Sequence, residues 1–288
     1  IPVKSINLKE SINQPSCSNE DMLKGFLIDQ GFTEVVNSPF CSLNKPDSIK
    51  VDNPLDSNRG FLRTSLMDSL VENLIYNERR QKDTLKFFEI SDVYTFDNII
   101  TKVRKLGIIV SGRKGQNYID FSQKLDKQYL QSIFKEINID IEKYIFNLDR
   151  NLINSKIKTP IYGIELEIKH LEDSMSKYII KSKPLNNFIK YKPISEFPSS
   201  LRDLSFSVKN PTKIKEVIDT LSNIKSDLIK SSFMFDFYEN KKEGESKIGF
   251  RFIFQSNNET LTDIEIDKKV KEIIETLLVI PSVSLPGA

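Results

Sequence analysis

The last hundred residues switch between two hydrophobic periods, and the order of these periods restricts the possible folds more than any other feature of the chain. Alternating apolar residues are typical of strands with one buried face, and apolar residues three or four apart are typical of helices. The sequence predicts a strand over 201–208, a helix over 211–224, strands over 231–239 and 247–254, a helix over 262–277 and a short strand near 282–285. This order is that of the ferredoxin-like β-α-β-β-α-β arrangement, in which both helices cover one face of the sheet.

The other face of this predicted sheet is bare and carries side chains that could contact RNA. Strict alternation places Phe233, Phe235 and Phe237 on one face of the second strand, and Met234, Asp236 and Tyr238 on the other. Arg251 on the third strand would then lie beside Asp236 and Tyr238. A ring with neighbouring cations resembles the surfaces on which single-stranded RNA bases stack. The alternative is a surface tyrosine beside an ion pair between Asp236 and Arg251, a common cross-strand pair.

The first 182 residues show a more mixed pattern of helices and strands. A helix is expected over 19–30, with Ser18 as its N-cap and Gly31 as its stop. A stripe of apolar residues that continues for four turns predicts a second helix over 61–78. The other expected elements are strands over 33–39, 85–96, 103–110, 143–146 and 161–168 and a helix over 123–137. Three prolines between 182 and 198 indicate a linker.

Composition excludes several classes of protein. Lysine and arginine total 42 against 40 acidic residues, so any contact with nucleic acid must be local. No apolar run reaches the roughly 20 residues of a membrane helix, and two cysteines are too few for a disulfide framework. His170 is the one histidine, which excludes a multi-histidine metal site, and residues 112–115 lack the spacing of a phosphate loop. From the length we expect two domains, and from the two cysteines a reducing compartment. Because the sequence starts at Ile1 rather than Met, we expect it to be part of a longer protein.

Nine short strings resemble, in the same order, the beta subunit of bacterial phenylalanyl-tRNA synthetase. They are NPLDS (53–57), FLRTSL (61–66), NL (73–74), FFEI (87–90), FPSSLRDL (197–204), FDFY (235–238), Gly244, LTD (261–263) and PGA (286–288). Each string is weak alone, but the ordered set is specific. The resemblance implies an α+β chain: a class II synthetase-like antiparallel sheet module over 1–182, a linker over 183–194, and a ferredoxin-fold anticodon-binding domain over 195–288.

The resemblance also implies that the first module is catalytically silent. A class II site needs an arginine shortly before the glutamate of its second motif, because a neutral residue cannot hold the α-phosphate of ATP. Residues 86–88, which precede Glu89, are Lys-Phe-Phe, and Lys169 follows the strand where a further arginine is expected. A lysine offers phosphate a point charge rather than a fork. We expect no catalytic residue here and no nucleotide pocket.

Carried over residue by residue, the resemblance predicts four residues that bind the anticodon. Tyr238 is the ring on which the first anticodon base would stack, and Asp236 would accept from N1–H and the amine of a guanine, which suits a GAA anticodon. Lys247 and Arg251 on the adjoining strand are placed to meet phosphate or base edges. Lys247 departs from the family pattern, since relatives often have a small polar residue there.

For partners, the resemblance implies the alpha subunit, in an alpha2-beta2 assembly, and tRNA(Phe), with neither membrane nor DNA. The stripes of the helices over 19–30 and 61–78 are the candidate contacts with the alpha subunit, unless the chain's own core buries them. No cofactor or metal is expected in this chain, whereas the cytoplasmic holoenzyme, a phenylalanine–tRNA ligase, uses ATP and magnesium. The alternatives are a stand-alone class II phenylalanyl-tRNA synthetase, which the missing arginines disfavour, and a pure scaffold fragment.

Overall fold

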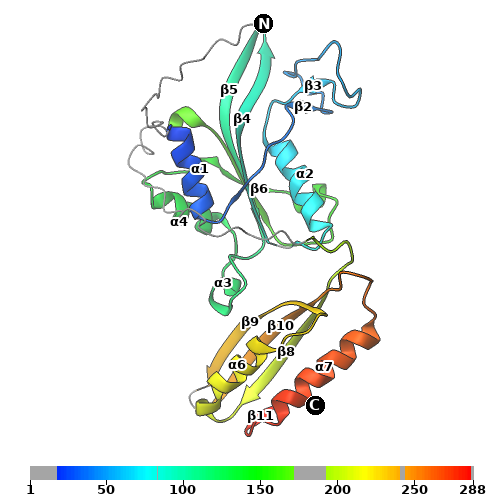
Figure 1. The fold of residues 1–288 in the computed structure, drawn as a ribbon. Helices are drawn as coiled ribbons and strands as arrows, with labels where there is room; N and C mark the ends of the chain where they lie inside the picture. Colours follow the sequence, from blue (N-terminus) through cyan, green and yellow to red (C-terminus); the bar gives the residue numbers. More distant parts are fainter. Residues whose placement is uncertain (1–17, 83, 172–192, 241–243, 287–288) are drawn as a thin grey trace, which may run out of the picture.

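The computed structural model describes residues 18–82, 84–171, 193–240 and 244–286, which form two lobes (Figure 1). The first lobe is built on a five-stranded sheet and the second on a four-stranded sheet. A small separate sheet pairs β2 (Phe40–Cys41) with β3 (Phe61–Leu62). Most of the predicted linker over 183–194 lies outside the described residues, so the domain boundaries stay predictions.

The first lobe is a sheet covered by helices on both faces. Its strands are β1 (Thr33–Glu34), β4 (Leu85–Asp97), β5 (Ile99–Ser111), β6 (Ile145–Leu148) and β7 (Ile161–Glu167). Their order is β1-β4-β5-β7-β6, and neighbours are antiparallel except for β1 and β4. Helices α1 (Asn19–Asp29) and α4 (Lys127–Lys135) lie on one face and α2 (Met67–Glu78) on the other (Figure 1).

Each face of this sheet has its own apolar cluster. Phe26 of α1 and Phe134 of α4 are fully buried in one cluster, and Leu70 and Leu74 of α2 are fully buried in the other. The stripes that the sequence offered as contacts with a partner subunit therefore belong largely to the chain's own core. That placement of the docking surface is wrong for these residues, because the sheet between the helices already buries them.

Helix α2 begins at Met67 rather than near residue 61, because residues 61–62 form β3 and pair with β2. The N–H of Leu66 donates to Oε1 of Glu165 (3.0 Å), and the N–H of Met67 donates to Oγ of Ser65 (3.1 Å). The expected strand over 33–39 is likewise shorter, since only β1 pairs with β4. The predicted cap of α1 is confirmed: Ser18 and Asp21 form a capping box, and Gly31 follows with φ +78°.

The second lobe has the predicted order of elements. They are β8 (Ser200–Val208), α6 (Ile214–Asn223), β9 (Ile229–Asn240), β10 (Glu245–Phe254), α7 (Asp263–Leu278) and β11 (Val283–Ser284). The sheet order is β11-β8-β10-β9, with α6 and α7 packed on one face over a cluster that contains Phe206, Phe252 and Leu221. Thr262 and Glu265 form the expected capping box of α7. The ferredoxin-like arrangement is confirmed.

Strand β9 does not alternate strictly. The pairing of β9 with β10 shifts between Gly249 and Phe250, so Phe235 is an extra residue in a bulge. One extra residue exchanges the two faces of a strand beyond it. The predicted division is therefore wrong at this point: Met234 packs toward the helices, whereas the rings of Phe233 and Phe235 contact the first lobe.

Among the described residues, the lobes contact each other around Gln81 and around a short helix of the first lobe. Gln81, which follows α2 in the left-handed conformation (φ +61°), accepts from the N–H of Ser199 at Oε1 (2.7 Å) and donates from Nε2 to the carbonyl oxygen of Ser199 (2.9 Å). The second contact is made by α3 (Tyr118–Ser122), a short helix of the first lobe that lies against β9 (Figure 1).

Candidate nucleic-acid interface

The sheet face that α6 and α7 leave uncovered carries three of the four predicted RNA-binding residues as exposed side chains. Lys247 of β10 lies directly opposite Tyr238 of β9, and Gly249 lies opposite Asp236. The Tyr238 side chain is 58% exposed, and Asp236 and Lys247 are also exposed. A ring, a carboxylate and an ammonium group are thus grouped on two neighbouring strands.

Gly249 allows a ring to lie at the sheet surface beside this group. A Cβ at this position would come within 2.9 Å of Cζ of Phe235 and within 3.0 Å of Cβ of Asp236. Because a Cβ essentially never approaches another atom so closely, the present position of the Phe235 ring depends on the glycine.

The fourth predicted residue, Arg251, is held by a different partner from the one considered in the sequence. Its Nε and Nη2 each lie 2.7 Å from an oxygen of Asp203 on β8, a two-point contact. The alternative expectation, an ion pair between Asp236 and Arg251, is therefore wrong. The register explains the difference, because Arg251 lies opposite Asp203 on one side and opposite Phe233 on the other.

Helix α3 covers the part of this face next to Arg251. The Phe121 ring centroid is 5.7 Å from that of Phe233 and 5.8 Å from that of Phe235. The guanidinium carbon of Arg251 lies 5.1 Å from the Phe121 centroid and 5.4 Å from the Phe235 centroid, within the range of cation–π attraction. The face is thus bare at Tyr238 and occupied at Phe235.

Sequence reasoning missed α3, although its start carries a recognisable signal. Asn117 caps the helix, since its Oδ1 accepts from the N–H groups of Ile119 (3.1 Å) and Asp120 (2.9 Å). Arg113 then fixes the end, donating from Nη1 to the carbonyl oxygen of Phe121 (2.9 Å) while its guanidinium lies over the Phe121 ring. A five-residue helix is too short to show a hydrophobic stripe that would reveal it.

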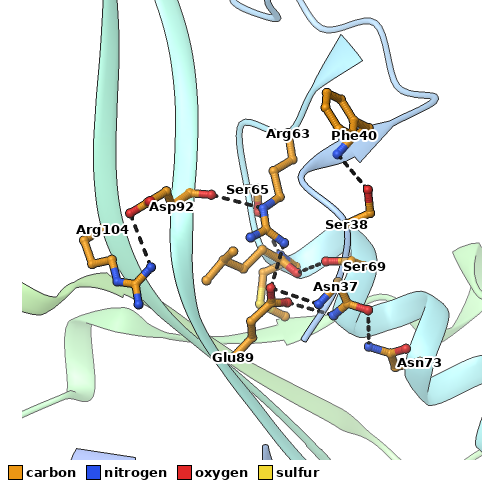
Figure 2. Close-up of polar contacts among 12 residues, drawn as sticks. Asn37, Ser38, Phe40, Arg63, Ser65, Ser69, Asn73, Glu89, Asp92 and Arg104 are labelled. Carbon is orange, nitrogen blue, oxygen red and sulfur yellow. Dashed lines mark hydrogen bonds and ion pairs between the residues drawn. The ribbon is translucent and has the colours of Figure 1, made fainter. Parts of the chain in front are cut away.

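Glu89 in the first lobe has its oxygens fully engaged within the chain (Figure 2). Oε1 accepts from Nη1 of Arg63 (2.8 Å) and from the N–H of Asn37 (3.3 Å), and Oε2 accepts from Nδ2 of Asn37 (2.7 Å). Nε of Arg63 donates to the carbonyl oxygen of Asp92 (3.1 Å), and Asn73 donates to Asn37 (2.9 Å). Arg63 and Glu89 are both buried, so this network joins β3, β4 and α2 rather than facing a ligand.

The lysines considered as phosphate contacts are also engaged. Nζ of Lys86 donates to the carbonyl oxygen of Gln30 (3.0 Å) and lies over the rings of Phe32 and Tyr129. Burial, followed by the charge of Lys114, lowers the pKa of Lys86, and burial raises the pKa of Tyr129 to about 12. Lys169 is ion-paired with Glu167.

His170 contacts an aromatic ring of the first lobe. His170 stacks on Tyr144, whose hydroxyl lies 3.3 Å from Nδ1. Among the described residues, no group of three or more histidine, cysteine or acidic side chains is placed to hold a metal ion. None of the helices described is both long enough and apolar enough to cross a bilayer.

Comparison with protein families agrees with this architecture. Residues 195–281 match the ferredoxin-fold anticodon-binding domain, which defines the class of the second lobe. Residues 2–151 match the CLM domain of the phenylalanyl-tRNA synthetase beta chain. That match covers more than half of the sequence, so the chain belongs to the phenylalanyl-tRNA synthetase beta chain family.

Curated relatives give the same family. The chain is 27% identical to the phenylalanine–tRNA ligase beta subunit of Mycoplasma mycoides, with 96% of this chain and 39% of the relative aligned. It is 26% identical to the chloroplastic phenylalanine–tRNA ligase beta subunit of Porphyra purpurea, with 90% of this chain and 40% of the relative aligned. It is 28% identical to the phenylalanine–tRNA ligase beta subunit of Fusobacterium nucleatum, with 96% of this chain and 39% of the relative aligned. The chain spans about two fifths of the length of these relatives.

Proposed function

We propose that this chain reads the anticodon of tRNA(Phe) as part of a cytoplasmic phenylalanyl-tRNA synthetase. The observation that carries the proposal is the exposed group of Tyr238, Asp236 and Lys247 on the helix-free face of an anticodon-binding domain. A base can stack on Tyr238, Asp236 can accept from the N1–H and amine of a guanine, and Lys247 can meet a phosphate. The carboxylate favours guanine because the Watson–Crick edge of this base presents two donors side by side.

The first lobe serves, in this proposal, as a class II-like module without catalytic chemistry. Its mostly antiparallel sheet is covered on both faces, Glu89 accepts from Arg63 and Asn37, and Lys86 donates to the Gln30 carbonyl group. Because of these contacts, the side chains that would meet ATP are bonded to other residues of the chain. The holoenzyme would bind ATP and magnesium through other residues than these.

The contact with an alpha subunit, in an alpha2-beta2 assembly, needs a surface other than the buried helix stripes. The β4–β5 hairpin offers one, because Phe96, Ile99 and Ile100 at its end are each more than half exposed. We propose this hairpin end as part of the docking surface. Co-purification of the alpha subunit with an Ile99→Ser/Ile100→Ser variant, compared with the unchanged chain, tests that placement.

The main experiment replaces Tyr238 by alanine in the assembled enzyme. Loss of one stacking contact, worth roughly 1–3 kcal/mol, should weaken tRNA use by about 5- to 150-fold. ATP–pyrophosphate exchange with phenylalanine should not change, because that reaction needs no anticodon. The matched control is Tyr76→Ala, a tyrosine of α2 in the first lobe that is about as exposed as Tyr238. Unchanged charging by Tyr238→Ala would contradict the proposal.

The alternative of a stand-alone synthetase predicts a different result for the isolated chain. A chain with its own active site would show ATP–pyrophosphate exchange with phenylalanine without any partner, whereas the proposal expects none until the alpha subunit is added. A pure scaffold, in turn, would support exchange in the complex and leave charging insensitive to Tyr238.

A further inference from the structure

The surface around Phe235 has the composition of a base-stacking site that is already filled. Phe233 and Phe235 present rings on the helix-free face. Two hydrogen bonds to Asp203 fix the orientation of the Arg251 guanidinium, whose central carbon lies 5.4 Å from the Phe235 ring centroid. The group in contact with all three is the ring of Phe121, which comes from the other lobe. The Phe121 ring is tilted by 55° to Phe233 and by 66° to Phe235, so it fills the site without parallel stacking. A flat RNA base can stack on such rings and on a guanidinium plane.

We propose that Phe233, Phe235 and Arg251 form a second base-stacking site for single-stranded RNA, and that Phe121 occupies this site while RNA is absent. The inference rests on the proposed function, since it extends the surface that Tyr238 begins. A base that entered the site would replace the Phe121 ring and keep the same contacts with the two phenylalanines and with the guanidinium. No covalent step is involved.

The position of this site suits a continuous RNA strand. Phe235 and Tyr238 lie on the same strand, three residues apart, which is at most about 10 Å at 3.3 Å per residue and less across the bulge at Phe235. Asp236 lies between them, and Gly249 opposite Asp236 leaves the space through which the Phe235 ring reaches the surface. Two bases of one loop can therefore meet Tyr238 and Phe235 together.

The segment that fills the site is a short surface helix, held at its end by Arg113 through the Phe121 carbonyl group and ring. Helix α3 has five residues and no fully buried side chain, and Phe121 itself is only partly buried. Its ring contacts on β9 are made by Tyr118 and Phe121. A base can stack in parallel where Phe121 makes only tilted and edge-on contacts, which favours replacement of the Phe121 ring by a base.

The test measures binding of a fluorescent 17-nucleotide anticodon stem–loop with a GAA anticodon to the complete 288-residue chain by anisotropy. Phe121→Ser should tighten binding by about fivefold or more, because RNA no longer has to displace a ring. Ile119→Ser, on the same helix and exposed, is the matched control and should leave binding unchanged. The double variant Phe121→Ser/Phe235→Leu should lose the gain, since leucine keeps the apolar volume and removes the ring.

Three outcomes separate the claims. Tighter binding by Phe121→Ser that disappears in the double variant supports the second site. Unchanged or weaker binding by Phe121→Ser, while binding still depends on Tyr238, overturns the second site and leaves the proposed function intact. If neither Tyr238→Ala nor Phe121→Ser alters binding, both proposals fail. Thermal unfolding of each variant shows that the compared chains are folded.

Discussion

The two sheets of this chain differ in how many of their faces the chain itself covers. In the first lobe, α1 and α4 cover one face and α2 the other, and Glu89 and Arg63 between them are buried and paired. In the second lobe, α6 and α7 cover one face only, and Tyr238 on the other face remains exposed. The difference indicates where ligand chemistry can occur: polar groups support the fold in the first lobe and remain available to a ligand in the second.

The largest effect is expected where the first lobe buries charge. Arg63→Ala leaves Glu89 buried without its cation, and such losses destabilise by about 3–5 kcal/mol. Urea unfolding of the first lobe should show this change, and RNA binding by the folded protein should not. The control is Lys102→Ala, whose exposed ammonium group pairs with Asp92 and should contribute little to stability. Equal effects of the two variants would mean that burying the Arg63–Glu89 pair does not make it more important for stability than a surface ion pair.

A smaller effect is expected at the bulge of the second sheet. Gly249→Ala places a Cβ against the Phe235 ring and should destabilise the second lobe by about 1–3 kcal/mol. Since the Phe235 ring can move, a crystal structure or ring NMR shifts should show it displaced from Phe121. An unchanged stability and ring position would mean that the glycine is not needed for this surface.

The smallest effect concerns an ion pair that links α1 to β5. The hydrogen bond from Arg104 lowers the pKa of Glu20, so the pair stabilises the fold at pH values above the unfolded pKa and loses this effect as the pH falls through the folded pKa. Glu20→Gln should cost less than about 1 kcal/mol at pH 7 and less still near pH 3. Unfolding curves at the two pH values measure the difference. A constant difference would show that charge is not the cause.

Sequence patterns predicted the second lobe better than the first for a physical reason. Its elements have clear periods, and local signals such as the Thr262–Glu265 cap depend only on residues close in sequence. The start of α2 depends instead on Glu165, which is a hundred residues away from Ser65, and no local pattern contains that information. Similarly, the bulge at Phe235 arises from pairing with β10, so strict alternation assigned Phe233 and Phe235 to the wrong face.

The candidate site shows the same limit. The exposure of Tyr238, Asp236 and Lys247 follows from their places on the strands, and the structure leaves them where the pattern put them. Whether they bind RNA stays a prediction. The sequence does not indicate that Arg251 pairs with Asp203, nor that the Phe121 ring covers Phe235. Both contacts join segments that are far apart in sequence.

The double covering of the first sheet also limits how this lobe could change over evolutionary time. Phe87, which directly precedes Phe88 and Glu89, is buried in the cluster that contains Leu70 and Leu74. An arginine at position 87 would place a charge among these leucines without a partner, and the fold would be destabilised before any nucleotide could be held. Phosphate binding at this position would therefore require helix α2, which covers it, to move as well.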